Sequence, residues 1–244
     1  MLEISELMVW LRDARSSPSP ARLVLCDRAI ETVSGWAGVS TPRRFVDAYL
    51  IPSWAHVRML NAIAAIAIDV VYNDERRDYF EDRPEHQAWA EVVNDPELRL
   101  RDAAESRRPA ALARTLARLS WLSERIPEGH PARRQIDVLQ REVRTPRSTL
   151  AWFDRLVAQG RLNESRRSRT RNALMHGGPL ASAIVEVVLP FALYMADESL
   201  GRALEAHLEG EAADAAFLRR SRELERMRRR LADGVPAAEA LSLT

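Results

Sequence analysis

The segment AHVRMLNAIAAIAIDVVY, residues 55–72, decides the fold class of this chain. Its apolar residues cover nearly every side of an α-helix, which is the pattern of a helix buried inside a protein. The apolar run at residues 59–71 is too short to span a bilayer. We therefore predict a buried central helix, which begins at the N-cap pair Thr41-Pro42 and is kinked at Pro52.

The composition of the remaining chain agrees with that prediction. Of the 244 residues, 46% are hydrophobic and only 9 are glycine. Ala, Leu, Arg and Glu dominate, and these are strong helix formers. β-Branched residues never alternate over a sustained stretch. The sequence therefore predicts an all-α protein, a multi-helix bundle whose helices are joined by short Pro/Gly turns.

Apolar spacing and turn residues place the other helices. Gln159-Gly160 is expected to end one helix, and Asn163 is expected to cap the next. Helices are predicted over residues 2–15, 20–35, 84–94, 96–106, 108–126, 133–143, 148–158, 164–176 and 179–209, the last of them bent at Pro190.

Three parts are expected along the chain: an N-terminal helical region at 1–106, a helical core at 107–210, and a C-terminal amphipathic helix with a tail at 211–244. In the last part Phe217, Leu224 and Leu231 repeat at seven residues with Met227 between them. Such a short repeat favours a helix that docks on its own domain over a coiled coil.

Charge and cysteine content limit the classes of function. The 36 basic residues are all Arg, and the net charge is only +1, so any basic binding site must be local. The single Cys26 excludes an intramolecular disulfide and is expected to be a buried, inert thiol. The N-terminus lacks the basic region of a signal peptide. We expect a cytoplasmic protein that does not enter a membrane.

The segment RNALMHG, Arg171 to Gly177, carries the one distinctive chemical pattern. It resembles the Arg-x4–6-His motif of HEPN-family (higher eukaryote and prokaryote nucleotide-binding) ribonucleases, including the Asn after the Arg and the Gly after the His. The pairs Arg125…His130 and Arg202…His207 also fit the bare spacing, but without those neighbours. The resemblance covers residues 108–209 and implies a HEPN-like helical core.

The resemblance implies a metal-independent endoribonuclease, a toxin or an antiviral defence effector, with Arg171, Asn172 and His176 as catalytic residues. The RNA 2′-OH would attack the neighbouring phosphate and leave a 2′,3′-cyclic phosphate. Histidine titrates near neutrality and can move the proton, with a helix C-terminus favouring its charged form. Arginine can stabilise the charge on the phosphorus. No metal and no cofactor is expected.

One geometric difficulty concerns the spacing of the motif. Five residues at about 100° each separate Arg171 and His176 by about 140° on a straight helix. The family places its site at a dimer interface, which implies a homodimer with a composite site here. Arg169, seven residues from His176 and on its face, remains a rival for the arginine role.

The residues before the motif are rich in arginine. Arg161, Arg166, Arg167 and Arg169 join Arg171 against the single acid Glu164, a local charge of about +4 that suits an RNA backbone. A solvated helix face explains the same pattern. Nearby Trp152 and Phe153 are expected to be core residues and not base-stacking platforms.

Other classes of site are not indicated. Cys and His spacing does not suit zinc, His56 and His86 are isolated, and Gly-rich phosphate loops are absent. Two further functions remain open: a HEPN-like module that binds RNA, nucleotides or a partner without cutting, and a helical interaction protein in which RNALMHG is a coincidence. The resemblance also allows an antitoxin or another defence-system partner protein.

Overall fold

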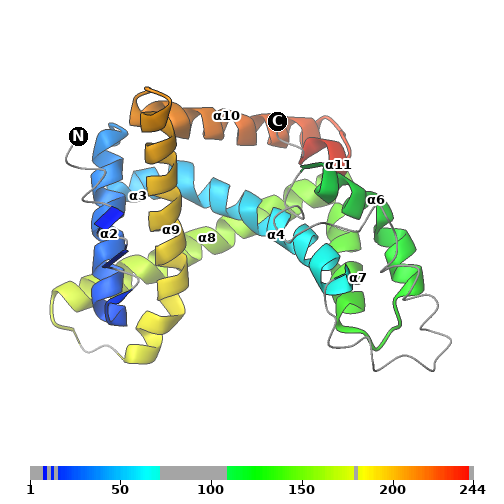
Figure 1. Ribbon diagram of the computed structural model, residues 1–244, viewed down its shortest axis with the longest axis horizontal. Helices are drawn as coiled ribbons and strands as arrows, with labels where there is room; N and C mark the ends of the chain where they lie inside the picture. The colour runs from blue at the N-terminus through cyan, green and yellow to red at the C-terminus, as the bar shows by residue number, and fades with distance from the viewer. Residues whose placement is uncertain (1–7, 10–11, 14–15, 72–108, 179–180, 242–244) are drawn as a thin grey trace. The chain divides into compact units, whose positions relative to one another are not determined.

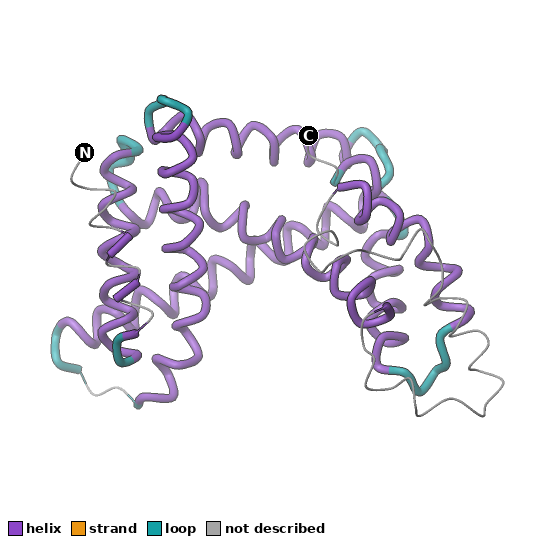
Figure 2. The backbone as a smooth tube through the Cα atoms, viewed as in Figure 1, coloured by secondary structure: helices purple, strands orange, loops and turns teal. Residues whose placement is uncertain are grey.

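The computed structural model of this chain describes residues 8–9, 12–13, 16–71, 109–178 and 181–241. Within these residues the regular structure is helical, without a strand, and short loops join the helices (Figure 2). The all-α class predicted from composition is confirmed. The loop and two helices predicted between residues 73 and 106, and most of the helix predicted at 2–15, lie outside the described residues.

The chain divides into two compact units, each built from separate stretches of sequence. Unit 1 comprises Met1–Ala55 and Arg155–Leu224, and unit 2 comprises His56–Asp154 and Glu225–Thr244. The predicted three-part division at residues 106/107 and 210/211 stays a prediction. In the described part of the chain, no helix has both the length and the apolar character needed to cross a membrane.

Two helices of unit 1, α2 (Ser19–Trp36) and α9 (Ser182–Leu208), lie side by side (Figure 1). They run in the same direction, since the Ser19 hydroxyl near the start of α2 bonds to Glu186 near the start of α9. α9 continues through Pro190. Both helices bury apolar side chains, and these form much of the core of unit 1: Leu23, Ile30, Val33, Val188, Ala192 and Met195.

The region around Pro52 departs from regular α-helix. As predicted, Thr41 caps α3 (Pro42–Phe45), accepting a hydrogen bond from the Arg44 N–H at 3.3 Å. A single π turn, η1 (Val46–Leu50), follows and leads into α4 (Ile51–Val71). A proline ring clashes with the carbonyl four residues before it, and a wider turn relieves that crowding. The irregularity predicted at Pro52 is therefore a π turn directly before it.

The helix that carries the motif is longer than predicted. Residues 146–175 form one helix, α8 (Pro146–Met175), so the break predicted at Gly160 and the cap predicted at Asn163 are wrong. A Cβ on Gly160 would lie 2.8 Å from Ile51 Cγ2 and 3.2 Å from the Trp54 ring. Gly160 thus allows α8 to pack closely on the start of α4. In the sequence, a glycine needed for such packing cannot be distinguished from one that ends a helix.

Unit 2 holds a pair of helices, α6 (Pro109–Arg125) and α7 (Pro131–Val143), joined by the turn predicted around Gly129. The short helix α11 (Ala237–Ala240) packs on α6. In α10 (Ala213–Ala232) the predicted heptad residues are all buried within this chain, whereas docking on a single domain stays a prediction, because the boundary between the two units falls inside this helix. The predicted residues are Phe217, Leu224, Met227 and Leu231.

The close approach at Gly160 predicts a stability difference between two helical glycines. Gly160→Ala should lower the free energy of unfolding by about 1–2 kcal/mol, because overpacking outweighs the gain in helix propensity. Gly201, in α9, is exposed with open space around its Cα, so Gly201→Ala should raise it by about 0.5–1 kcal/mol. Urea titrations of both variants measure the difference, and equal stabilisation would contradict the packing role.

Candidate active site

The last turns of α8 carry two stripes of residues at helical spacing. Gly160, Glu164, Arg167 and Arg171 are separated by four, three and four residues, so they share one face of the helix. Arg166, Arg169, Asn172 and His176 are separated by three, three and four residues, so they share another face. The first set faces inward and the second is exposed.

The inward stripe joins α8 to α2 through ion pairs. Arg167 is 5% exposed, pairs with Asp27, and donates from Nε and Nη2 to the two Glu164 oxygens at 2.7 and 2.8 Å. Arg171 lies 3.1 Å from Asp27 and donates to Glu31 at 2.7 Å. Its guanidinium is thus committed to two carboxylates of α2, with a further 3.2 Å bond to Asn172.

Burial acts on the charges of the inward stripe. It raises the pKa of the Glu164 carboxyl to about 8 and lowers the pKa of the Arg167 guanidinium to about 10, because each charge loses contact with water. The bidentate bond between them offsets that loss of hydration. Arg167 is therefore a core ion-pair residue and does not belong to the exposed RNA-binding surface expected from the sequence.

The exposed stripe holds the remaining residues of the predicted site. Arg166 and Arg169 are exposed and form no ion pair with the described residues. Asn172 and His176 are also exposed at the end of the helix. Arg169, Asn172 and His176 are thus placed together on one accessible face, whereas Arg171 lies on the ion-paired face. The continuous α-helix keeps Arg171 and His176 of a single chain apart in direction.

Gly177 ends α8 by a local backbone mechanism. It has φ of 68°, and the N–H of Gly178 bonds to the Ala173 carbonyl at 2.8 Å, which is a Schellman motif with His176 as the C-cap. Glycines with positive φ follow three other helices in the same way, at positions 38, 210 and 234. The glycine after the histidine therefore has a structural reason that is independent of catalysis.

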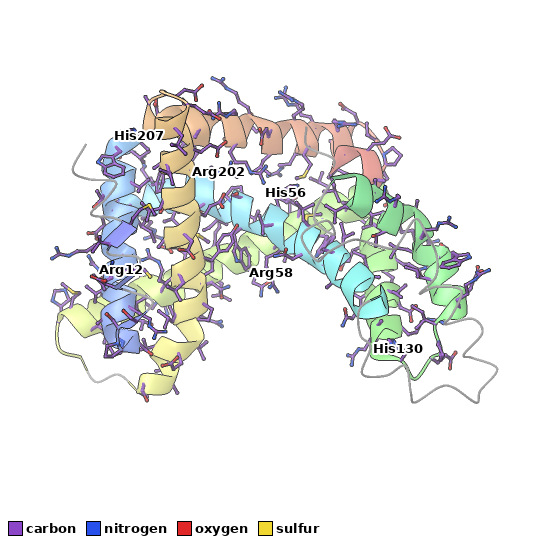
Figure 3. The ribbon with its side chains drawn as sticks, in the orientation of Figure 1. Arg12, His56, Arg58, His130, Arg202 and His207 are labelled. Carbon is purple, nitrogen blue, oxygen red and sulfur yellow. The ribbon has the colours of Figure 1, made fainter. Side chains whose placement is uncertain are left out.

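In the two other Arg…His pairs, His130 and Arg202 have structural roles. His130 caps α7, since its Nδ1 accepts a hydrogen bond from the Ala132 N–H at 3.1 Å. Arg202 pairs with Glu198 and Glu205 at 3.1 Å each, and His207 lies exposed in the last turn of α9. Figure 3 labels His130, Arg202 and His207 in these places.

The basic charge predicted around the motif is largely compensated. Arg161 pairs with Asp47 at 2.8 Å, and Asp27 and Glu31 take up Arg167 and Arg171. Only Arg166 and Arg169 of the five arginines remain unpaired on the surface of the described chain. Phe153 is fully buried, as expected, and Trp152 is half-buried.

A cleft beside the inward stripe was not predicted from the sequence. Its larger part, of about 340 Å³, lies between α8 and the α3–η1 segment. Its smaller part, of about 200 Å³, is also lined by α2, and the two parts share Arg43 and Glu164. The signal that could have indicated the ion pairs was the four-residue spacing of Asp27 and Glu31, which matches that of Arg167 and Arg171. Among the described residues, no group of three or more His, Cys, Asp or Glu side chains could hold a metal ion.

The two stripes predict effects of different size on stability. Arg167→Ala should lower the free energy of unfolding by about 3–5 kcal/mol, because it leaves Glu164 buried without its cation and Asp27 paired with Arg171 alone. Arg169→Ala, two residues away and exposed, should change it by less than about 0.5 kcal/mol. Chemical denaturation followed by circular dichroism measures both values. Similar losses in the two variants would mean that the faces are assigned incorrectly.

The buried thiol of Cys26 predicts a reactivity difference between folded and unfolded chain. Its side chain is 0% exposed, and burial raises its pKa to about 12, so the thiol stays protonated at pH 8. Iodoacetamide should leave Cys26 unmodified in the native protein. It should alkylate Cys26 rapidly in guanidinium chloride at about 6 M, a concentration that unfolds most proteins. Mass spectrometry reads the modification, and fast native labelling would contradict the burial.

Comparison with known proteins adds no relative to this picture. No family model matches the chain, and neither a curated protein nor a solved structure matches it. The resemblance to HEPN ribonucleases therefore depends on the residues of the motif themselves, and the geometry at the end of α8 is the evidence on which a function can be argued.

Proposed function

We propose that this chain is a metal-independent endoribonuclease of HEPN type, whose active site is the exposed stripe at the end of α8. The observation that carries the proposal is the placement of Arg169, Asn172 and His176 on one accessible face at three- and four-residue spacing. A cation, an amide and a titratable imidazole on one face are the groups that cleavage of RNA without a metal requires.

The reaction proceeds by attack of the RNA 2′-oxygen on the adjacent phosphorus. The 2′-O–P bond forms, the P–O5′ bond breaks, and the products are a 2′,3′-cyclic phosphate and a free 5′-hydroxyl. One proton leaves the 2′-OH and one reaches the 5′-oxygen, and His176 carries one of these transfers. Arg169 neutralises the charge that develops on the phosphate oxygens, and Asn172 positions the phosphate.

Arg169 is preferred over Arg171 as the catalytic arginine. Arg169 is exposed on the same face as His176, and the described residues leave it without an ion pair. Arg171 has a side chain 32% exposed and is engaged by Asp27 and Glu31. Its recruitment to a phosphate would first break those bonds, which costs free energy.

A second copy of the chain supplies the other half of the site in this proposal. One histidine cannot both remove and deliver a proton in a single displacement, and two facing copies bring two imidazoles to one phosphate. Exposed apolar side chains close to the motif along the chain favour such contact: Met175, Ile184 and Val187 are 50% or more exposed. By resemblance, the enzyme acts as a toxin or antiviral effector that a partner protein restrains.

A non-catalytic RNA-binding or partner-binding module is the second candidate. It is favoured by the ion pairs of Arg171, because the arginine that fits the motif best is held by α2. Such a module would bind RNA through Arg166 and Arg169 without cutting it.

The test is cleavage of mixed RNA in excess EDTA by the wild type and by single variants. His176→Ala should abolish cleavage, and Arg169→Ala should lower the rate by about 10²–10³-fold, the typical effect of removing one oxyanion-stabilising group. His207→Ala, a change of an exposed histidine at the end of α9, is the matched control and should retain full activity. The products should carry 2′,3′-cyclic phosphate ends.

Three results would separate the alternatives. Cleavage that persists in His176→Ala excludes the proposed site. Cleavage lost in Arg171→Ala but retained in Arg169→Ala assigns the arginine role to Arg171, once circular dichroism shows that the Arg171→Ala protein is folded. RNA binding without cleavage by the wild-type protein supports the second candidate.

A further inference from the structure

The cleft between α8 and the α3–η1 segment is lined by side chains that can bind phosphate. Arg43 and Arg44 from α3 and Arg161 from α8 line its larger part, together with the hydroxyl groups of Thr41 and Ser165. Guanidinium groups bind phosphate through paired N–H donors and stay charged at every physiological pH. Arg161 was predicted from the sequence to bind RNA, whereas Arg43 and Arg44 were not singled out as site residues.

The arginines of the cleft are available to a ligand. Arg43 and Arg44 are exposed, and within the described chain neither forms an ion pair. Arg44 makes only a 3.4 Å bond to the Ser40 hydroxyl. Arg161 is paired with Asp47, but both side chains are at least half exposed, so the pair is screened by water and an incoming phosphate can compete for the guanidinium.

The two acids that line the larger part of the cleft, Asp47 and Glu164, do not cancel this charge. Glu164 lies at the inner side and is held by Arg167 in a bidentate bond, which compensates its charge locally. Asp47 is then the one carboxylate that faces the three arginines of the larger part of the cleft. The local balance favours an anion.

The cleft and the proposed active site lie along the same helix, α8. Arg161 precedes His176 by fifteen residues on α8, which is about 22 Å along the helix axis. Ser165, which lines the cleft, is adjacent to Arg166 of the exposed stripe. An extended polyanion can therefore follow α8 from the cleft to His176, with Arg166 and Arg169 along its path.

We infer that the cleft formed by Arg43, Arg44 and Arg161 binds backbone phosphates of single-stranded RNA several nucleotides away from the bond that is cut. The inference rests on the proposed function for the identity of the ligand. It extends that function by a substrate-binding subsite on α3, a helix outside the motif, and it makes the enzyme prefer RNA long enough to reach both places.

The experiment measures binding of a fluorescent 2′-O-methyl RNA of about 12 nucleotides, a length within the range of single-strand sites. This RNA has no free 2′-OH to react, so binding is read without cleavage. Arg43→Ala and Arg44→Ala should each weaken binding about 3–10-fold at low salt and reduce the slope of log affinity against log salt by about 0.7, the effect of one lost phosphate contact on a single strand.

Arg28→Ala is the matched control, because Arg28 is an exposed arginine of α2 in the same unit and does not line the cleft. It should leave affinity and salt slope unchanged. Unaltered binding by both cleft variants would overturn the inference, as would an equal loss in Arg28→Ala, which would indicate a general charge effect. Equal loss of adenosine monophosphate binding would also overturn it, because the cleft would then be a mononucleotide pocket.

These results are independent of the cleavage assay. If the cleft variants lose RNA binding while the wild type cuts no RNA, the inference that the cleft binds RNA is supported and the proposed catalytic function is wrong. If the wild type cuts RNA and the cleft variants bind it normally, the function stands and the inference about the cleft fails.

Discussion

Asp27 and Glu31 stand four residues apart on α2, and Arg167 and Arg171 stand four residues apart on α8, so opposite charges join the two helices at matched spacing. Asp27, Glu164 and Arg167 are nearly inaccessible to water. A buried charge without a partner costs several kcal/mol, so the loss of any one of these side chains destabilises the whole set. The rotation of α8 about its axis follows from this constraint.

That rotation decides which side chains can reach a substrate. With Arg167 and Arg171 turned toward α2, the residues one step around the helix are exposed to water, and these include Arg169, Asn172 and His176. The same rotation sets Glu164 and Arg161 along the cleft with α3. The core ion pairs and the proposed catalytic face are thus two consequences of one orientation of α8. Arginine serves both, because its charge persists when buried and its donors match carboxylate and phosphate alike.

The structure also shows that the residues of the motif are not equally strong evidence for catalysis. Gly177 is required by the backbone conformation at the helix end, so its position after His176 is not specific to catalysis. Arg171 has an evident structural role, while Arg169 is the accessible cation. A pattern match treats all residues of the motif as equivalent, whereas burial and ion pairing distinguish those that hold the helix from those that face the solvent.

The sequence by itself determined the all-α class, a helix that includes residues 55–71, the Thr41 cap and the burial of Cys26, because helix propensity, capping and apolar periodicity act between residues close in the chain. Tertiary structure alone decided the role of Gly160, which depends on Ile51 and Trp54, and the continuity of α8 through it. It also decided which arginines are exposed. Arg167 and Arg169 are chemically identical and two residues apart, but Arg167 is buried with Asp27 of α2 and Glu164 of its own helix, whereas Arg169 is exposed.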